Sequence, residues 1–331
     1  MSSSDLARVV GVRVWIARAL RPRAFAATFG CALLTVLLFC GCGLGPGPTP
    51  GGVRLAVSEG FGAHVLGSSS SPHVEGQQTV MSLLQRNYDV KTRYGGGFVQ
   101  SIDGHSGGTQ AGEPVDWFYY VNGVEAPKGA AETNVGAGER IWWDLHNWGQ
   151  TDSVPAVVGS YPEPFLNGIE GKRYPLREEC SEPSGAACAT VRKRLTALGV
   201  PVALAAVSSE EVQLTLRVVV GPYSALGDSL SVHDVAAGPR YSGVYARFSG
   251  SGGTLTLLDG AGRAVRTLGA GAGLVAATRY GEQAPVWLIT GTNAAGVNLA
   301  ADALSESELR NRFALALEPS GMAQPVPVAQ P

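Results

Sequence analysis

The sequence contains little charge, and almost all of its basic residues are arginine. Only 16% of the 331 residues are charged, and four of the 25 basic side chains are lysine. Beyond residue 41 no cluster of basic residues is long enough to follow a phosphate backbone, which disfavours nucleic-acid binding. The five histidines are scattered, and no pair has the spacing of metal ligands on one helix or hairpin. The composition therefore indicates neither a nucleic-acid-binding protein nor a metal centre.

Long hydrophobic runs are also missing. The most apolar run, Ala24–Phe39, spans about sixteen residues, which is short for a helix that crosses a bilayer. It follows five arginines and is followed by the small residue Gly41, which is the arrangement of a secretory signal. We therefore expect residues 1–41 to be a signal peptide. Its removal takes away five arginines and one aspartate, which leaves 20 basic and 26 acidic residues and a net charge of −6.

The junction Phe39–Cys42 resembles the end of a bacterial lipoprotein signal, although leucine is usual where Phe39 stands. The resemblance implies that Cys42 carries the lipid and that the protein is anchored at the extracytoplasmic face of the cell membrane. Residues 42–52, rich in glycine and proline, would then form a flexible tether. An uncleaved anchor that ends at Cys40 is the alternative.

Cysteine is scarce outside this amino-terminal segment. Of the five cysteines, only Cys180 and Cys188 lie beyond residue 42. The residues between them include Pro183 and Gly185, which allow the chain to fold back. An exported protein meets an oxidising compartment, so we expect these two residues to form a disulfide. Two free buried thiols are the alternative.

Aromatic residues concentrate in residues 116–148, which hold four of the six tryptophans. Aromatic side chains favour strands, because they fit a half-buried pleated surface. Asn122–Gly123 is a strong turn signal, since both residues tolerate positive φ. The segment therefore predicts two antiparallel strands, Asp116–Val121 and Gly138–Trp148, joined by a loop of about a dozen residues.

The preceding segment predicts a short helix at Gln78–Arg86 and a hairpin of two strands, Val90–Tyr94 and Phe98–Ile102. The order of motifs, TV-x-LL, V-x-T-x-Y-GG-x-FV-x-SI, W-x-YYVNG and GERIWW, resembles the transcobalamin-like C-terminal domain family, small β-grasp-like domains of bacterial surface proteins. The resemblance covers residues 52–148. It implies a ligand-binding domain, with a corrinoid such as cobalamin as the first candidate ligand and a transporter as a candidate partner.

The rest of the chain has few aromatic residues and alternating strand and helix patterns. Apolar runs predict strands at residues 155–159, 202–207, 212–220, 243–248, 254–259, 286–292 and 313–317. Helical periodicity appears at residues 187–198 and 293–304, and residues 273–279 fit either structure. We therefore expect an α+β protein, with a β-grasp-like domain at 53–149, a mixed α/β domain at 150–320 and a disordered, proline-rich tail at 321–331.

Alternation along the aromatic strands divides their side chains between two faces. Trp117, Tyr119 and Val121 share one face, and Phe118 and Tyr120 share the other. One face fills the core of the small domain, and the other either packs on the second domain or meets a ligand. We expect Trp117 to lie in the core and Trp142 to lie nearer the second domain. The candidate ligand-binding residues are Trp117, Tyr119, Asn122, Trp142, His146 and Trp148.

No motif in the sequence predicts catalysis. Gly104–Gly108 fits the G-x-S-x-G pattern, but a polar loop follows where a hydrolase needs a helix. Gly269–Gly273 lacks the last glycine of the dinucleotide-binding fingerprint. No nucleophile, base and orienting group can be assembled from spacing, so we do not expect an enzyme.

Two functions stay open. The first is a lipoprotein that binds a corrinoid or another small molecule. In the animal transcobalamins a histidine ligates the cobalt, but it lies in a helical domain that this chain lacks, and the alternative for His146 is a strand histidine packed beside tryptophans. The second is a cell-surface protein that binds another protein and no small molecule.

Overall fold

The computed structural model of the protein describes residues 52–74, 76–208, 214–227 and 229–329. The signal peptide, the lipid attachment at Cys42 and the tether up to residue 51 are predictions that lie outside the described residues. Within these ranges, none of the helices has the length and apolar composition required to cross a bilayer.

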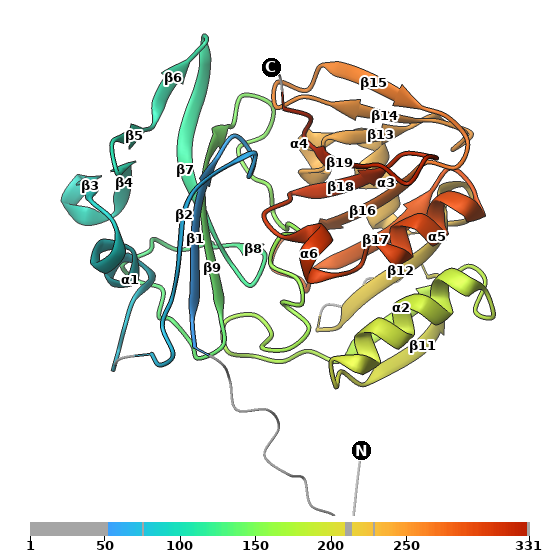
Figure 1. Ribbon diagram of the computed structural model, residues 1–331, viewed down its shortest axis with the longest axis horizontal. Helices are drawn as coiled ribbons and strands as arrows, with labels where there is room; N and C mark the ends of the chain where they lie inside the picture. The colour runs from blue at the N-terminus through green and yellow to red at the C-terminus, as the bar shows by residue number, and fades with distance from the viewer. Residues whose placement is uncertain (1–51, 75, 209–213, 228, 330–331) are drawn as a thin grey trace, which may run out of the picture. The chain divides into compact units, whose positions relative to one another are not determined.

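The first sheet has six strands and contains the aromatic segment (Figure 1). Its order is β2-β1-β9-β7-β6, and the short strand β8 pairs with β7. The central pair, β1 and β9, is parallel, and the other neighbouring pairs are antiparallel. Its strands are β1 (Arg54–Glu59), β2 (His64–Ser70), β6 (Gly108–Gln110), β7 (Glu113–Val121), β8 (Val124–Glu125) and β9 (Arg140–Asn147).

One face of the first sheet is covered by a helix and a small three-stranded sheet. These are α1 (Val80–Asn87), β3 (Val90–Arg93), β4 (Phe98–Ile102) and β5 (His105–Ser106). The helix predicted at Gln78–Arg86 is present but begins two residues later, at Val80, because Thr79 caps it. The Thr79 hydroxyl accepts a hydrogen bond from the Ser82 backbone, and the Ser82 hydroxyl accepts one from the Thr79 backbone.

The predicted alternation along the aromatic strands is confirmed. Trp117 and Tyr119 are buried in the core between the first sheet and α1, whereas Tyr120 and Trp142 are buried on the opposite face. Asn122 has a φ of 52° and Gly123 a φ of 79°, and these two residues turn β7 into β8 as their sequence predicts.

The second sheet has seven strands in the order β11-β10-β12-β17-β16-β18-β19. Its first four strands are parallel, and the last three join antiparallel, so the mixed sheet and the α+β class are confirmed. The residues left open at 273–279 form a strand. The strands are β10 (Leu176–Cys180), β11 (Val202–Ala206), β12 (Leu216–Pro222), β16 (Gly273–Thr278), β17 (Val286–Gly291), β18 (Ala314–Leu317) and β19 (Ala323–Val326).

Helices cover one face of the second sheet, and helices with a three-stranded sheet cover the other. The first face carries α2 (Ala186–Ala197) and α5 (Ala294–Asp302). The second face carries α3 (Leu230–Ala237), α4 (Pro239–Ser242), β13 (Ala246–Phe248), β14 (Leu255–Leu258) and β15 (Ala264–Leu268). Both helices predicted in this part of the chain are therefore present, as α2 and α5.

A single hydrophobic cluster, the shared core, joins residues from both sides of the predicted boundary at residue 149. It contains Tyr120 and Trp142 of the first sheet together with Tyr245 and Phe313. The Phe313 ring lies edge-on to both aromatic rings of the first sheet. Its centroid is 5.6 Å from that of Tyr120 and 5.1 Å from that of Trp142. The outer aromatic face of the first sheet is thus used for packing.

Two expectations about the second part of the chain are wrong. Residues 155–159 form no strand and contribute only one isolated bridge, between Ala156 and Val124. The tail predicted to be disordered contains β19, which pairs with β18, and the Val328 backbone bonds to Leu258. The prolines of the tail suggested disorder. However, β19 is an edge strand, and an edge strand tolerates a proline such as Pro325 because its outer side needs no hydrogen-bond donor.

The predicted disulfide between Cys180 and Cys188 is present. Cys180 ends β10, and Cys188 lies in the first turn of α2, so the bond ties the strand to the helix that follows it. The Cα atoms are 6.3 Å apart, within the usual range for a disulfide. The carboxylate of Glu178 lies beside these sulfur atoms. Within the described part of the chain, these three residues form the one group of neighbouring side chains that could ligate a metal. Since both sulfurs are engaged in the bond, this group is not a metal site.

Candidate functional site

Four of the predicted ligand-binding residues are held by hydrogen bonds inside the protein. Trp117 donates through Nε1 to the carbonyl oxygen of His105, and the Tyr119 hydroxyl donates to the carbonyl oxygen of Lys128. The Asn122 side chain donates to Gly168 and accepts from the Arg140 backbone. Trp142 donates through Nε1 to the Ser58 hydroxyl over 2.7 Å. All four side chains are buried, so their positions support packing.

The other two predicted residues differ in exposure. His146 is buried, and its ring lies between those of Phe61 and Phe118, with centroids 4.6 Å and 4.5 Å away. Trp148 is 37% exposed and donates through Nε1 to Asp116. The structure therefore does not bring the six candidate residues together around one cavity.

Asp144 is the centre of a buried hydrogen-bond network that sequence reasoning missed. Its carboxylate accepts the Ser58 hydroxyl at 2.5 Å, the backbone N–H of Phe61 at 2.9 Å and that of Gly62 at 2.8 Å. Nδ1 of His146 lies 2.9 Å from the same carboxylate. The network holds β1, the turn that follows it and β9 in one arrangement.

Ser58, Asp144 and His146 are residue types of a hydrolytic triad, but their arrangement is different. The Ser58 hydroxyl donates to Asp144 and accepts from Trp142, so it has no contact with the imidazole. A nucleophilic serine needs its base within hydrogen-bond reach. This network is therefore structural.

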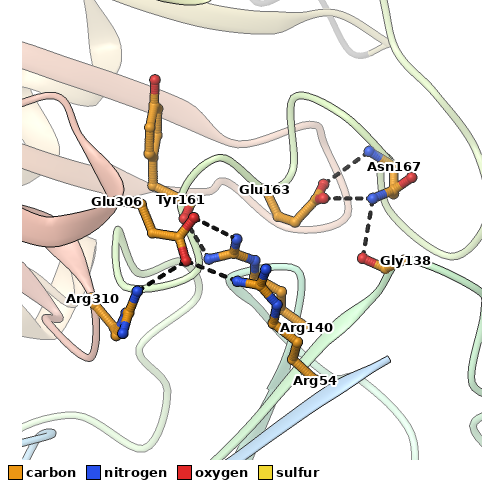
Figure 2. Close-up of polar contacts among 8 residues, drawn as sticks. All are labelled: Arg54, Gly138, Arg140, Tyr161, Glu163, Asn167, Glu306 and Arg310. Atoms are coloured by element: carbon orange, nitrogen blue, oxygen red, sulfur yellow. Dashed lines mark hydrogen bonds and ion pairs between the residues drawn. The ribbon is translucent and has the colours of Figure 1, made fainter. Parts of the chain in front are cut away.

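A cluster of three arginines around one glutamate lies elsewhere, and sequence reasoning did not predict it. Figure 2 shows Arg54, Arg140 and Arg310 converging on the carboxylate of Glu306. Glu306 Oε1 accepts from Arg54 at 2.8 Å and from Arg310 at 3.2 Å, and Oε2 accepts from Arg140 at 2.9 Å. Arg140 also donates to the carbonyl oxygen of Tyr161. We call these four residues the arginine cluster.

The fold places these residues together from three distant segments. Arg54 on β1 and Arg140 on β9 are register partners in the parallel pair, so their side chains leave the same face side by side. Two like charges in that position repel each other unless an anion lies between them. The anion comes from the short helix α6 (Glu306–Leu309), which Ser305 caps and which Arg310 follows.

The arginine cluster lines a cavity of about 490 Å³. Ser70 pairs with Arg54 and Ser68 with Ala56 across β2 and β1, so both hydroxyls lie on the same face as the guanidinium groups. Gly159 forms part of the wall, where an added Cβ would lie 2.7 Å from the Trp142 ring. A second cavity of about 360 Å³ shares Arg54, Ser70 and Arg140 with the first.

The positive charge of the cluster is only partly neutralised. Three guanidinium groups face the Glu306 carboxylate, and Glu163, near Arg140, is engaged by Asn167. Burial raises the pKa of Glu306, but the hydrogen bonds and charges of Arg140 and Arg54 outweigh it and bring the pKa below the ordinary 4.5. Arg54 and Arg310 are 57% and 62% exposed, so such ion pairs contribute little to stability. The cluster is therefore suited to holding an anion.

The lowered pKa of Glu306 predicts a pH dependence of stability. A carboxyl whose pKa is depressed by folding stabilises the protein above its unfolded pKa and loses that contribution as the pH falls through the folded pKa. We expect wild-type protein to lose more unfolding free energy below pH 4.5 than Glu306→Gln does. Urea unfolding at pH values on both sides of 4.5 measures this, with exposed Glu308→Gln as the control. Identical pH profiles for wild type and Glu306→Gln would contradict it.

Comparison with known proteins gives a partial match. Residues 77–147, within the segment that carries the transcobalamin-like resemblance, match DUF4430, a domain of unknown function. A solved structure of a "putative metal binding protein" from Ruminococcus gnavus ATCC 29149 is 14% identical, covers 29% of this chain and 97% of its own, and has a TM-score of 0.24. No curated relative matches the chain. The matching domain has no known function, and the solved structure is too dissimilar to support an argument. The function is therefore argued from the site.

Proposed function

We propose that the protein is a lipid-anchored, extracytoplasmic binding protein whose ligand carries an anionic group held by Arg54, Arg140 and Arg310. One observation carries the proposal: three guanidinium groups meet at the wall of a cavity around a single carboxylate. The role is binding, and no catalytic step is assigned to the site.

The chemistry of the cavity fits such a ligand. Guanidinium groups bind carboxylate and phosphate in fixed, often bidentate geometry. Arg140 is only 15% exposed and donates to two acceptors, so the position of its guanidinium group is fixed. Arg54 and Arg310 are more exposed, and each donates to Glu306 through one nitrogen of its guanidinium group. Ser68 and Ser70 add hydroxyl groups for the uncharged part of the ligand.

The transcobalamin-like resemblance makes a corrinoid one candidate ligand, delivered in this proposal to a transporter. Cobalamin carries a phosphodiester group, which the arginine cluster would hold. Direct ligation of cobalt by His146 has little support, because that ring is stacked between two phenylalanines and bonded to Asp144. A corrinoid would therefore bind through its anionic group.

The site is tested by titrating the protein, purified from membranes of an exporting host, with simple carboxylates, phosphates, cell-wall fragments and cobalamin. We expect Arg310→Gln to weaken binding of the anionic ligand at least about tenfold, since a hydrogen bond to a charged group contributes about 1.5 to 3 kcal/mol. Arg263→Gln is the matched control, because Arg263 is also exposed and also pairs with an acid four residues away.

Equal binding by wild type, Arg310→Gln and Arg263→Gln would show that the arginine cluster is not the site. Absence of binding by the whole panel would favour the other function considered for the sequence, a cell-surface protein that binds another protein. Calorimetry provides the affinities, and thermal unfolding checks that each variant is folded.

Lipid anchoring is tested separately at Cys42. In Cys42→Ala we expect the protein to lose its lipid and to be misprocessed or released from the membrane, because the acyl chains attach to the cysteine thiol and to the new amino terminus. Cell fractionation and mass spectrometry of the amino terminus measure both properties. Normal membrane retention of Cys42→Ala would exclude the lipid anchor while leaving the binding site untouched.

A further inference from the structure

The carboxylate of Glu306 is already an anion bound in the arginine cluster. Its two oxygens receive three hydrogen bonds, from Arg54, Arg140 and Arg310, over 2.8 to 3.2 Å (Figure 2). A ligand anion at this place would need the same N–H donors. Glu306 and such a ligand therefore compete for one position.

Only the arginines hold the Glu306 side chain. Within the described part of the chain, its carboxylate has no other hydrogen-bond partner, and the side chain is 32% exposed. The backbone around it is anchored independently, because the Ser305 side chain caps α6 and Leu309 is buried. The side chain can therefore turn toward solvent while α6 stays in place.

The donors are arranged for a planar group with two oxygens. Arg54 and Arg310 approach one oxygen, and Arg140 approaches the other. A tetrahedral phosphate would place additional oxygens outside this set of donors. The group that fits best is a second carboxylate, which disfavours cobalamin as the ligand because its anionic group is a phosphodiester.

Resting on the function proposed above, we propose that Glu306 occupies the position of the ligand's anionic group, that this group is a carboxylate, and that binding displaces Glu306. Each ligand must then displace the Glu306 carboxylate from the arginines in order to bind. The apparent affinity is reduced by the fraction of time that Glu306 leaves the arginines free. Glu306 thus sets both the class of ligand and the threshold concentration for binding.

If Glu306 instead orients the arginines for the ligand, replacing Glu306 should change the ligand affinity in the opposite direction. Removing a competitor strengthens ligand binding, whereas removing an orienting group weakens it. The direction of the change in affinity therefore decides between them.

The experiment titrates wild type, Glu306→Gln and Glu308→Gln with acetate and with inorganic phosphate at low ionic strength, using full-length exported protein labelled with ¹⁵N at arginine. The guanidinium resonances report both occupancy and integrity of the site. We expect Glu306→Gln to bind acetate at least about tenfold more tightly than wild type does, which corresponds to Glu306 occupying the arginines roughly nine-tenths of the time. Glu308 lies on the same helix and is exposed, and among the described residues the hydrogen bonds of the three arginines to a carboxylate of α6 all go to Glu306, so Glu308→Gln should bind like wild type.

Glu306→Asp keeps the charge but is one methylene shorter, and we expect it to show an intermediate gain, which preserves the test should the glutamine variant fold poorly. Unchanged or weaker acetate binding by the Glu306 variants, or a preference for phosphate over acetate, would overturn this inference. In those cases an effect of Arg310→Gln would still support the arginine cluster as the site. If neither wild type nor any variant, Arg310→Gln included, binds acetate or phosphate, the proposed anion-binding function is rejected.

Discussion

Trp142→Ala is expected to lower the free energy of unfolding by about 3 to 5 kcal/mol, the usual cost of truncating a large buried aromatic side chain. Its indole is buried in the shared core against the rings of Tyr120 and Phe313. It also donates a hydrogen bond to Ser58, whose hydroxyl would be left without that partner. Urea unfolding followed by circular dichroism measures the loss.

Trp148→Ala is the control for this change, because Trp148 lies on the same segment but is partly exposed and outside the hydrophobic clusters. We expect it to cost less than about 1 kcal/mol. Were Trp142 part of a ligand surface instead, its removal would weaken binding and leave the midpoint of unfolding nearly unchanged. Stability of Trp142→Ala equal to that of Trp148→Ala would contradict the packing described here.

Asp144→Ala is expected to lower the free energy of unfolding by at least about 3 kcal/mol, since hydrogen bonds to a buried charged group contribute about 1.5 to 3 kcal/mol each. The carboxylate accepts from Ser58, Phe61 and Gly62 and contacts His146, and all of these residues are buried. The turn after β1 should loosen first, because two of its backbone N–H groups lose their acceptor. Hydrogen exchange of the Phe61 and Gly62 amides measures this directly.

Asp116→Ala provides the matched control on the neighbouring strand. Asp116 is half-buried and accepts one side-chain hydrogen bond, from Trp148, so its loss should cost about 1 kcal/mol or less. Equal destabilisation by the two substitutions, or unchanged amide exchange in Asp144→Ala, would show that Asp144 does not organise the network.

Local features of the chain were predictable because short-range chemistry controls them. The helix predicted at Gln78–Arg86 is found at Val80–Asn87, and its apolar residues repeat with a local helical period. The Asn122–Gly123 turn depends on two residues that accept positive φ. The Cys180–Cys188 disulfide joins two cysteines that are eight positions apart, with Pro183 and Gly185 between them to let the chain fold back.

The arginine cluster could not be predicted in the same way. Arg54 and Glu306 are 252 positions apart, and Arg140 and Glu306 are 166 apart. Nothing near Arg54 or Arg140 in the sequence distinguishes them from the other arginines. They become neighbours only because β1 and β9 pair in parallel with one particular register.

The α+β class, the alternation of the aromatic strands, the Asn122–Gly123 turn and the disulfide could all be predicted from the sequence, because each depends on residues close together or on a simple period. The tertiary structure decided how the faces were used. It buried Tyr120 and Trp142 against Phe313, converted the proline-rich tail into an edge strand, and gathered three arginines around Glu306. These outcomes depend on which surfaces meet when distant segments pack, and no local pattern encodes that choice.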